Sequence, residues 1–91
     1  MGVQTHELNT DPEAFDAVVE GRKNFEIRYD DRGYQVGDQL ILLKTRYTAE
    51  EMKRGYSLEY TDRAYGMRVS YITRGPCCGL AEGWVIMSIE V

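Results

Sequence analysis

The residues best suited to chemistry form a short charged run from Gly21 to Arg28. Lys23 lies in an expected turn, and Glu26 and Arg28 project from one face of the strand that follows, because side chains alternate along a strand. Together they offer a cation for a phosphate or carbonyl group, a carboxylate acceptor and a guanidinium suited to bidentate contacts. The alternative is a solvated strand face with a Glu26–Arg28 or Lys23–Glu26 ion pair, since surface ion pairs are common and weak.

The single histidine and the two cysteines indicate no catalytic or metal site. His6 has no serine or cysteine partner that the sequence identifies, so no catalytic triad is indicated. It shares a strand face with Leu8, which predicts a packed or hydrogen-bonded histidine; a place near the Lys23 cleft is the alternative. Cys77 and Cys78 are adjacent and lack the two-residue gap of zinc and thiol redox motifs. We therefore expect no metal and no cofactor.

Aromatic and basic residues are interleaved between positions 45 and 63. Tyr47 and Tyr56 stand out there, and the basic residues beside them are Arg46, Lys53, Arg54 and Arg63. Single-stranded nucleic acids are held by aromatic platforms among basic groups, each stacked base contributing about 1–3 kcal/mol. Tyrosines are also good strand formers that cover the flanks of a small barrel. Both interpretations stay open, and Tyr47 is kept as a candidate ligand-binding residue.

A helix before the charged run and a strand after it must position these side chains. Thr10 and Glu13 have capping-box spacing, and Pro12 suits a first turn, so a helix of about ten residues is expected to begin there. Apolar residues recur at helical spacing, and Gly21 is placed to end the helix with a positive φ. Residues 24–28 then alternate between polar and apolar side chains, the pattern of a half-buried strand.

The rest of the chain is expected to be mostly strand, at residues 3–8, 39–43, 64–73 and 84–91. Residues 39–43 are apolar on both faces, which predicts a central strand. Residues 48–55 are either one or two helical turns, capped by Thr48 and ended by Gly55, or part of a mobile hairpin arm. Because a small sheet must hide its edges, we expect one α+β domain over residues 1–91. Its fold would be a small mixed β-barrel, plugged by one short N-terminal helix.

Composition limits the classes of function. The chain has 91 residues, 43% hydrophobic and 29% charged, which suits one domain. The net charge of −4 argues against a general polyanion binder. All 11 basic residues lie between Arg22 and Arg74, with eight acidic ones, which leaves room for a local basic surface. Without a membrane-length apolar run or a signal-peptide pattern, we expect a cytoplasmic protein that is a monomer or weak dimer and binds no membrane.

The pattern Gly21-x-Lys23-x-x-Glu26-x-Arg28, after a short helix and at the start of a strand, resembles the signature of ASCH domains. These are small β-barrels of the PUA-like superfamily. The flanking segments His6-Glu7-Leu8, Val36-Gly37-Asp38-Gln39-Leu40, Tyr60-Thr61-Asp62-Arg63 and Val85-Ile86-Met87-Ser88-Ile89 fit the same pattern. The resemblance covers nearly the whole chain except residues 45–59, and it is to a small bacterial and phage branch.

The resemblance implies a PUA-like barrel with a cleft lined by the motif, and many members of the superfamily bind RNA or modified nucleosides. The leading hypothesis is an RNA- or nucleotide-binding domain. Lys23 and Arg28 would contact phosphate or base edges, and Glu26 would accept a hydrogen bond from a base or ribose. His6 and Tyr47 complete the candidate ligand-binding set.

Two other hypotheses remain. One ASCH branch hydrolyses acetylated cytidine with a lysine matched by Lys23 and a threonine whose place Glu26 takes here. A metal-free amidohydrolase with Lys23 and Glu26 catalytic is therefore the second hypothesis. It ranks below binding, because a neighbouring carboxylate favours the charged ammonium over the neutral base. The third is a protein-interaction domain whose charged motif only supports the barrel.

Overall fold

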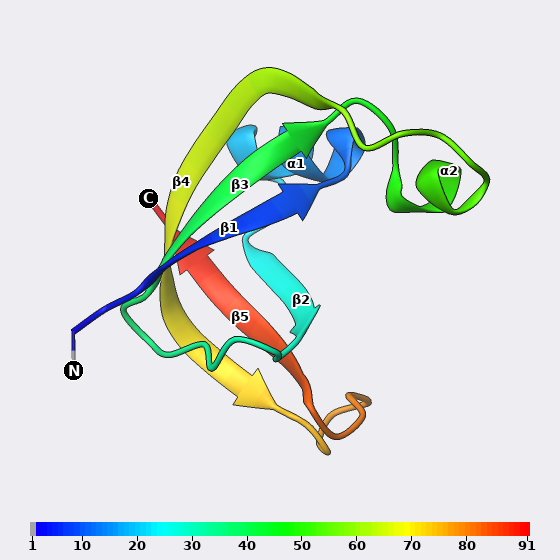
Figure 1. The fold of residues 1–91 in the computed structure, drawn as a ribbon. Helices are drawn as coiled ribbons and strands as arrows, with labels where there is room; N and C mark the ends of the chain where they lie inside the picture. The colour runs from blue at the N-terminus through cyan, green and yellow to red at the C-terminus, as the bar shows by residue number, and fades with distance from the viewer. Residues whose placement is uncertain (1) are drawn as a thin grey trace.

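The computed structural model describes residues 2–91, which form a mixed five-stranded sheet and two helices (Figure 1). In chain order the elements are β1 (Thr5–Thr10), α1 (Pro12–Val19), β2 (Phe25–Tyr29), β3 (Gln39–Thr45), α2 (Ala49–Lys53), β4 (Tyr60–Arg74) and β5 (Trp84–Glu90). Across the sheet the order is β1-β3-β4-β5-β2, so β3 is an interior strand, as its apolar sequence predicts. The expected α+β class and mixed sheet are confirmed.

The sheet curls into a half-barrel rather than closing on itself. β1 pairs with β3 in parallel, and the other strand pairs are antiparallel. The 15-residue β4 pairs with β3 along its first part and with β5 along its second, and register shifts of the kind that bulges produce interrupt both ladders. β1 and β2 are the two edges and do not pair with each other within residues 2–91. We call the gap between these two strands the seam.

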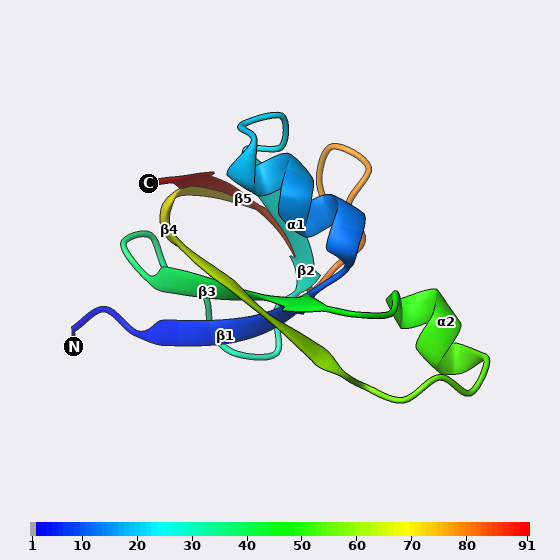
Figure 2. The same cartoon turned by 90° about the horizontal axis from the view of Figure 1, so that it is seen from above.

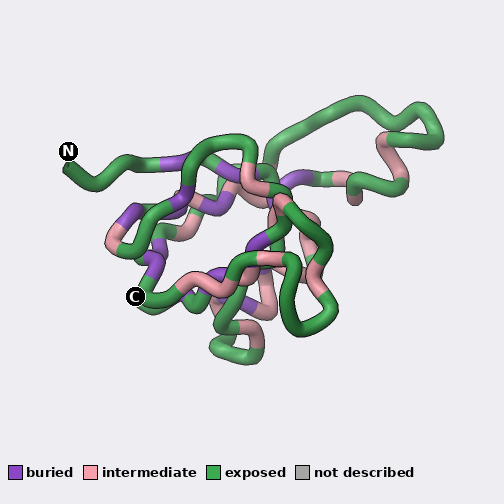
Figure 3. Tube along the Cα trace, turned by 90° about the horizontal axis from the view of Figure 1, so that it is seen from below, coloured by how far each residue is buried: buried purple, intermediate pink, exposed green. Residues whose placement is uncertain are grey.

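Helix α1 lies against the open side of the curled sheet and contributes to the core (Figure 2). Phe15 and Val18 are buried on its inner face. They pack with inward-facing strand residues that include Leu8, Leu40, Leu42, Met67, Val69, Val85, Met87 and Ile89. Buried positions alternate with exposed ones along the strands, as the alternating purple and green of Figure 3 shows. One side of each strand therefore faces this core.

The sequence predicted the C-terminal end of α1 correctly but not its N-terminal end. Gly21 follows the helix with a φ of 80°, as expected. The predicted start was wrong: the N-cap is Asp11, and no side chain of the described residues 2–91 caps the helix. Thr10 instead remains in β1, where its hydroxyl donates to the carbonyl of Leu8 at 3.1 Å. Because Thr10 belongs to the paired strand, it does not serve as the helix cap that the capping-box spacing predicts.

A second helix, α2, confirms the helical alternative for residues 48–55, so the fold has two helices and not the single N-terminal one expected. Thr48 caps it: the Thr48 hydroxyl accepts from the N–H of Glu51 at 3.0 Å, and the Glu51 carboxylate accepts from the N–H of Thr48 at 2.9 Å. Gly55 then ends the segment with a φ of 110°. Figure 2 shows residues 46–59, which we call the arm, standing out from the sheet. Within residues 2–91 neither helix is long and apolar enough to span a membrane.

Strand β2 turns its polar face inward. The predicted alternation is confirmed, with Phe25 and Ile27 on one face and Glu26 and Arg28 on the other. Glu26, however, is only 2% exposed, whereas Phe25 and Ile27 are 39% and 45% exposed. Pairing with β5 sets this orientation, because Glu26 lies opposite the buried Met87. The charged face therefore lines the inside of the seam and is not a solvated strand face.

Candidate functional site

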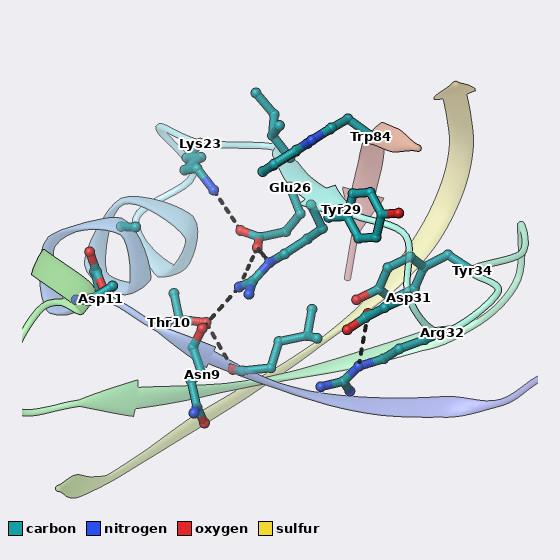
Figure 4. Close-up of a pocket in the computed structure, with 15 residues that line it drawn as sticks. Asn9, Thr10, Asp11, Lys23, Glu26, Tyr29, Asp31, Arg32, Tyr34 and Trp84 are labelled. Atoms are coloured by element: carbon teal, nitrogen blue, oxygen red, sulfur yellow. Dashed lines mark hydrogen bonds and ion pairs between the residues drawn. The ribbon is translucent and has the colours of Figure 1, made fainter. Parts of the chain in front are cut away.

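A pocket of about 510 Å³ lies in the seam, between the C-terminal end of β1 and strand β2 (Figure 4). The turn after β1, helix α1, the turn before β2, the loop after β2, the first residue of α2 and the first residue of β5 complete its wall. Lys23, Glu26 and Arg28 all line it. The structure thus brings together the three charged residues that the sequence singled out, in one concave site.

Glu26 is the charged centre of this pocket. Its carboxylate accepts from Lys23 Nζ through Oε2 at 2.6 Å and from Arg28 Nε through Oε1 at 3.0 Å. Such charge-assisted hydrogen bonds are shorter and stronger than neutral ones. Both ion pairs considered from the sequence therefore form, and they share one buried carboxylate.

Lys23 and Arg28 keep hydrogen-bond donors for a ligand. Their side chains are 23% and 28% exposed. Besides Glu26, Lys23 donates to the carbonyl of Phe25 at 2.9 Å, and Arg28 Nη2 donates to the carbonyl of Asn9 at 3.0 Å. An ammonium carries three donors and a guanidinium five. One N–H of Lys23 and the Nη1 group of Arg28 are therefore left without a partner within residues 2–91.

Two arginines bridge the seam in place of a β1–β2 ladder. Arg28 bonds the carbonyl of Asn9, and Arg32 Nη1 donates to the carbonyl of Glu7 at 2.8 Å. Both acceptors lie on the outer edge of β1, which would otherwise present unpaired backbone groups. Arg32 was missed from the sequence, because the turn-rich segment that carries it gave no sign that it folds back onto β1.

Tyr34 is a second pocket residue that no local pattern indicated. It is 1% exposed, and its ring meets the edge of the His6 ring at 4.9 Å between centroids. Burial raises the pKa of Tyr34, so its hydroxyl stays neutral at physiological pH. Its main-chain N–H and carbonyl are bonded to Asp30 and Arg74, but no hydrogen bond within residues 2–91 holds its hydroxyl. This neutral donor is available on the pocket side.

Tyr29 and Trp84 form an aromatic rim on the pocket. Their rings meet edge to face, with centroids 6.0 Å apart and planes at 74°. The two residues are direct cross-strand partners on β2 and β5, and both are exposed. Gly83 packs closely on the Tyr29 ring, where even a Cβ atom would lie 2.6 Å from it. Trp84 is the first residue of β5 and lies at this rim.

His6 lies outside the pocket, in a buried pair with Asp38. The His6 Nε2 to Asp38 Oδ2 distance is 2.9 Å, so the hydrogen-bonded histidine predicted from the sequence is confirmed. Burial alone raises the pKa of Asp38. Hydrogen bonds from the Gln4 N–H, from His6 and from the Gln35 N–H outweigh burial, and the net pKa shift is downward. This pair ties β1 to the turn before β3.

Tyr47 and the two cysteines also lie away from the pocket. Tyr47 packs against Tyr56 in the arm, with ring centroids 4.8 Å apart. Cys77 and Cys78 are exposed in the loop between β4 and β5, with their Sγ atoms 2.7 Å apart. Within residues 2–91 no group of three or more histidine, cysteine, aspartate or glutamate side chains is placed to hold a metal ion.

Comparison with known proteins gives a family. Residues 5–89 match the family described as a domain of unknown function, DUF3850. The chain belongs to that family. A stretch of 42 residues is also 45% identical to an uncharacterised 12.9 kDa protein in the GpA 3′ region of Escherichia phage P2. That stretch covers 46% of this chain and 38% of the phage protein. Neither name states an activity, so function has to be argued from the pocket.

Proposed function

We propose that the seam pocket binds a nucleotide, either free or as one unit of an RNA strand, and that the half-barrel is an ASCH-type member of the PUA-like superfamily. The observation that carries the proposal is the buried carboxylate of Glu26, which holds Lys23 and Arg28 on the pocket wall with donors to spare. A cationic pair fixed in this way suits a phosphate or the acceptors of a base edge.

Glu26 takes a different role from the one expected at first. Both of its oxygens already accept hydrogen bonds, and the side chain is almost fully buried. In the proposed complex Glu26 therefore orients the two cations instead of contacting base or ribose. Lys23 and Arg28 make the ligand contacts, and fixing them in advance lowers the entropy cost of binding.

The uncharged part of the pocket suits a base. Tyr29 and Trp84 offer exposed aromatic faces at the rim, and stacking a base on such a face contributes about 1–3 kcal/mol. The hydroxyl of Tyr34 supplies a neutral hydrogen bond to a base edge. A ligand with one planar ring and one anionic group would use both parts of the pocket.

The charge of the pocket favours a short ligand over a polyanion. Lys23, Arg28 and Arg32 are balanced by three lining acids, Asp11, Glu26 and Asp31. Binding that neutralises many phosphates depends steeply on salt, with a slope of about −0.7 per phosphate for single strands. We therefore expect the binding affinity to depend only weakly on salt concentration, with the slope of about one phosphate contact.

The hydrogen bonds of Lys23 fit a ligand-binding role better than a role as a general base. Its Nζ donates to both the Glu26 carboxylate and the Phe25 carbonyl, so the group is engaged as a proton donor. A general base needs an accessible lone pair on the nitrogen. Incubation with acetylated cytidine tests the alternative directly, and turnover lost in Lys23→Ala would favour the hydrolase.

The deciding experiment is NMR shift mapping with short RNAs, DNAs, mononucleotides and nucleosides. Perturbations are expected at residues 21–28 and at the Trp84 indole N–H. Arg28→Ala should weaken binding at least about tenfold, since hydrogen bonds to charged groups contribute about 1.5–3 kcal/mol. Arg46→Ala is the matched control, because Arg46 also pairs with a glutamate but in the exposed arm. Shifts confined to the arm would instead indicate a protein-interaction domain, and an absence of shifts would reject the proposal.

A further inference from the structure

Cys77 and Cys78 lie in the loop between β4 and β5 (orange in Figure 1), and the proposed nucleotide pocket uses neither. Both side chains are exposed, and their Sγ atoms are 2.7 Å apart, so one thiol donates a hydrogen bond to the other. Adjacent side chains in an extended chain point to opposite sides of the backbone. The local backbone must therefore be bent for the two thiols to meet.

A tight turn brings the two thiols to the same side. The N–H of Cys77 donates to the carbonyl of Leu80 at 3.2 Å, and the N–H of Leu80 donates to the carbonyl of Cys77 at 2.8 Å. Cys78 and Gly79 are the central residues of this turn, with φ of 54° and 86°, the pattern of a type I′ turn. Such a turn favours asparagine, aspartate or glycine, and Cys78 is the only non-glycine residue within residues 2–91 with a positive φ. Residues held in such a sparsely populated conformation cluster at functional sites.

Contacts at the base of the loop restrain this turn. The N–H of Gly75 donates to the carbonyl of Trp84 at 2.9 Å, and the N–H of Trp84 donates to the carbonyl of Ala81 at 3.1 Å. Gly75 lies so close to the carbonyl of Ala81 that no Cβ atom would fit between them. The fold thus holds the two thiols together, which lowers the entropy cost for a ligand that must bind both.

The protonation of the two thiols argues against a metal cation as the ligand. The hydrogen bond with Cys78 raises the pKa of Cys77, so this group is a neutral thiol near neutral pH. A metal ion binds the deprotonated thiolate and usually needs further protein ligands. Within residues 2–91 no group of three or more histidine, cysteine, aspartate or glutamate side chains is placed to supply them. The pair suits a soft centre that needs two sulfur ligands and can take up their protons.

A direct disulfide between the two residues is the competing product. Adjacent Cα atoms are about 3.8 Å apart across a trans peptide, whereas the Cα atoms joined by a disulfide are usually roughly 4.4–6.8 Å apart. A disulfide between neighbouring residues is therefore strained and readily reduced. An atom inserted between the two sulfurs enlarges the ring and relieves this strain.

We propose that Cys77 and Cys78 bind trivalent arsenic through both sulfurs, either as arsenous acid or as an organic arsenical with two exchangeable hydroxyls. Two As–S bonds form and two As–O bonds break. Each thiol proton leaves with a hydroxyl group as water, so arsenic stays trivalent and no oxidant or reductant is needed. Thiol sulfur is a soft ligand that prefers soft centres, and the turn holds two sulfurs ready for one such centre.

Intact-mass spectrometry of the full chain, without any nucleotide, is the first test. The wild type should take up one phenylarsine oxide per chain and lose both free thiols. The adduct should survive an excess of glutathione, because two separate monothiols are needed to displace a chelate. Cys78→Ser leaves one sulfur and should weaken retention at least about tenfold. Release of the wild-type adduct by glutathione, or equal retention by Cys78→Ser, overturns the proposal. In a parallel arm with sodium arsenite, an adduct assigns the site to inorganic arsenic as well, and its absence restricts the site to organic arsenicals.

Two substitutions at Gly79 test the turn while leaving both thiols in place. A Cβ atom at residue 79 would have no neighbouring atom within 4 Å, so only the backbone preference changes. Asparagine tolerates a positive φ, whereas valine does not. Gly79→Val should therefore weaken arsenical binding at least about fivefold, and Gly79→Asn, the matched control, should bind like the wild type. Equal binding by all three chains would show that any two adjacent cysteines suffice, and would overturn the role of the turn. No nucleotide takes part in these assays, so their outcome is independent of the proposed function.

Discussion

Replacing Glu26 with glutamine tests whether one buried carboxylate organises the pocket. Glutamine keeps the shape and one acceptor, but it turns an amide donor toward either Lys23 or Arg28. Breaking a buried ion pair and leaving its partner charged costs about 3–5 kcal/mol. Lys23 and Arg28 are 23% and 28% exposed, so each can reach water and recover part of that loss. We therefore expect Glu26→Gln to lower the free energy of unfolding by about 2 kcal/mol.

For a domain of this length, 1 kcal/mol corresponds to about 4–8 °C in melting temperature, so the expected drop is roughly 8–16 °C. Thermal unfolding followed by circular dichroism measures it. Glu59→Gln is the control, because Glu59 also pairs with an arginine, at 3.2 Å, but is half exposed. Glu59→Gln should change the free energy of unfolding by no more than about 0.5 kcal/mol. Equal effects from the two variants would refute the idea that burial makes Glu26 the organising residue.

Three further predictions concern the scaffold. Folding lowers the pKa of Asp38, so the stability that its carboxylate adds is present above the unfolded-state pKa and is lost as the pH falls through the folded-state pKa. We therefore expect the free energy of unfolding of Asp38→Asn to depend less on pH below about pH 4, as acid-unfolding curves can measure. Gly75→Ala would place a Cβ atom against a main-chain carbonyl of the following loop and should lower the free energy of unfolding by more than about 2 kcal/mol. Gly66→Ala, whose Cβ would make only an ordinary contact, should leave that free energy nearly unchanged, and chemical denaturation measures both. Thr48→Ala removes the cap of α2 and about 1 kcal/mol of local stability, so hydrogen exchange should rise in residues 49–53 with little change in melting temperature, because α2 buries no residue.

The features predicted well from the sequence are those that neighbouring residues decide. The Thr48 cap depends on a contact three residues away, and the helix-ending Gly21 depends on its own φ. The alternation in β2 also identified which side chains share a face. Local patterns of this kind hold wherever no tertiary contact competes with them.

The features that were missed depend on distant pairing. Alternation cannot tell which face of β2 is inside, because that is set by its register with β5. Thr10 fits a helix cap, yet parallel pairing with Lys44 keeps it in β1. Tyr34 and Arg32 enter the pocket only because the loop after β2 folds back onto β1. Nothing within a few residues of either position could have indicated this.

The cost of burying Glu26 separates a binding role from a purely structural one. Buried ion networks can often be replaced by apolar residues of similar volume with neutral or stabilising effect, by about 1–4 kcal/mol. A sequence selected only for barrel stability would therefore gain little from a charged inner face on β2. We expect the triple variant Lys23→Met, Glu26→Leu, Arg28→Met to fold with a melting temperature equal to or above that of the wild type.

That variant should bind no nucleotide. The result is informative in contrast with Glu26→Gln. Removing the carboxylate alone leaves the cations Lys23 and Arg28 without their anionic partner, whereas replacing all three residues leaves no unpaired charge. Differential scanning calorimetry of the triple variant, followed by NMR titration with the best ligand of the panel, measures both properties on one sample. If it fails to fold while Glu26→Gln remains folded, the network supports the barrel, and the charged inner face of β2 is explained without any ligand.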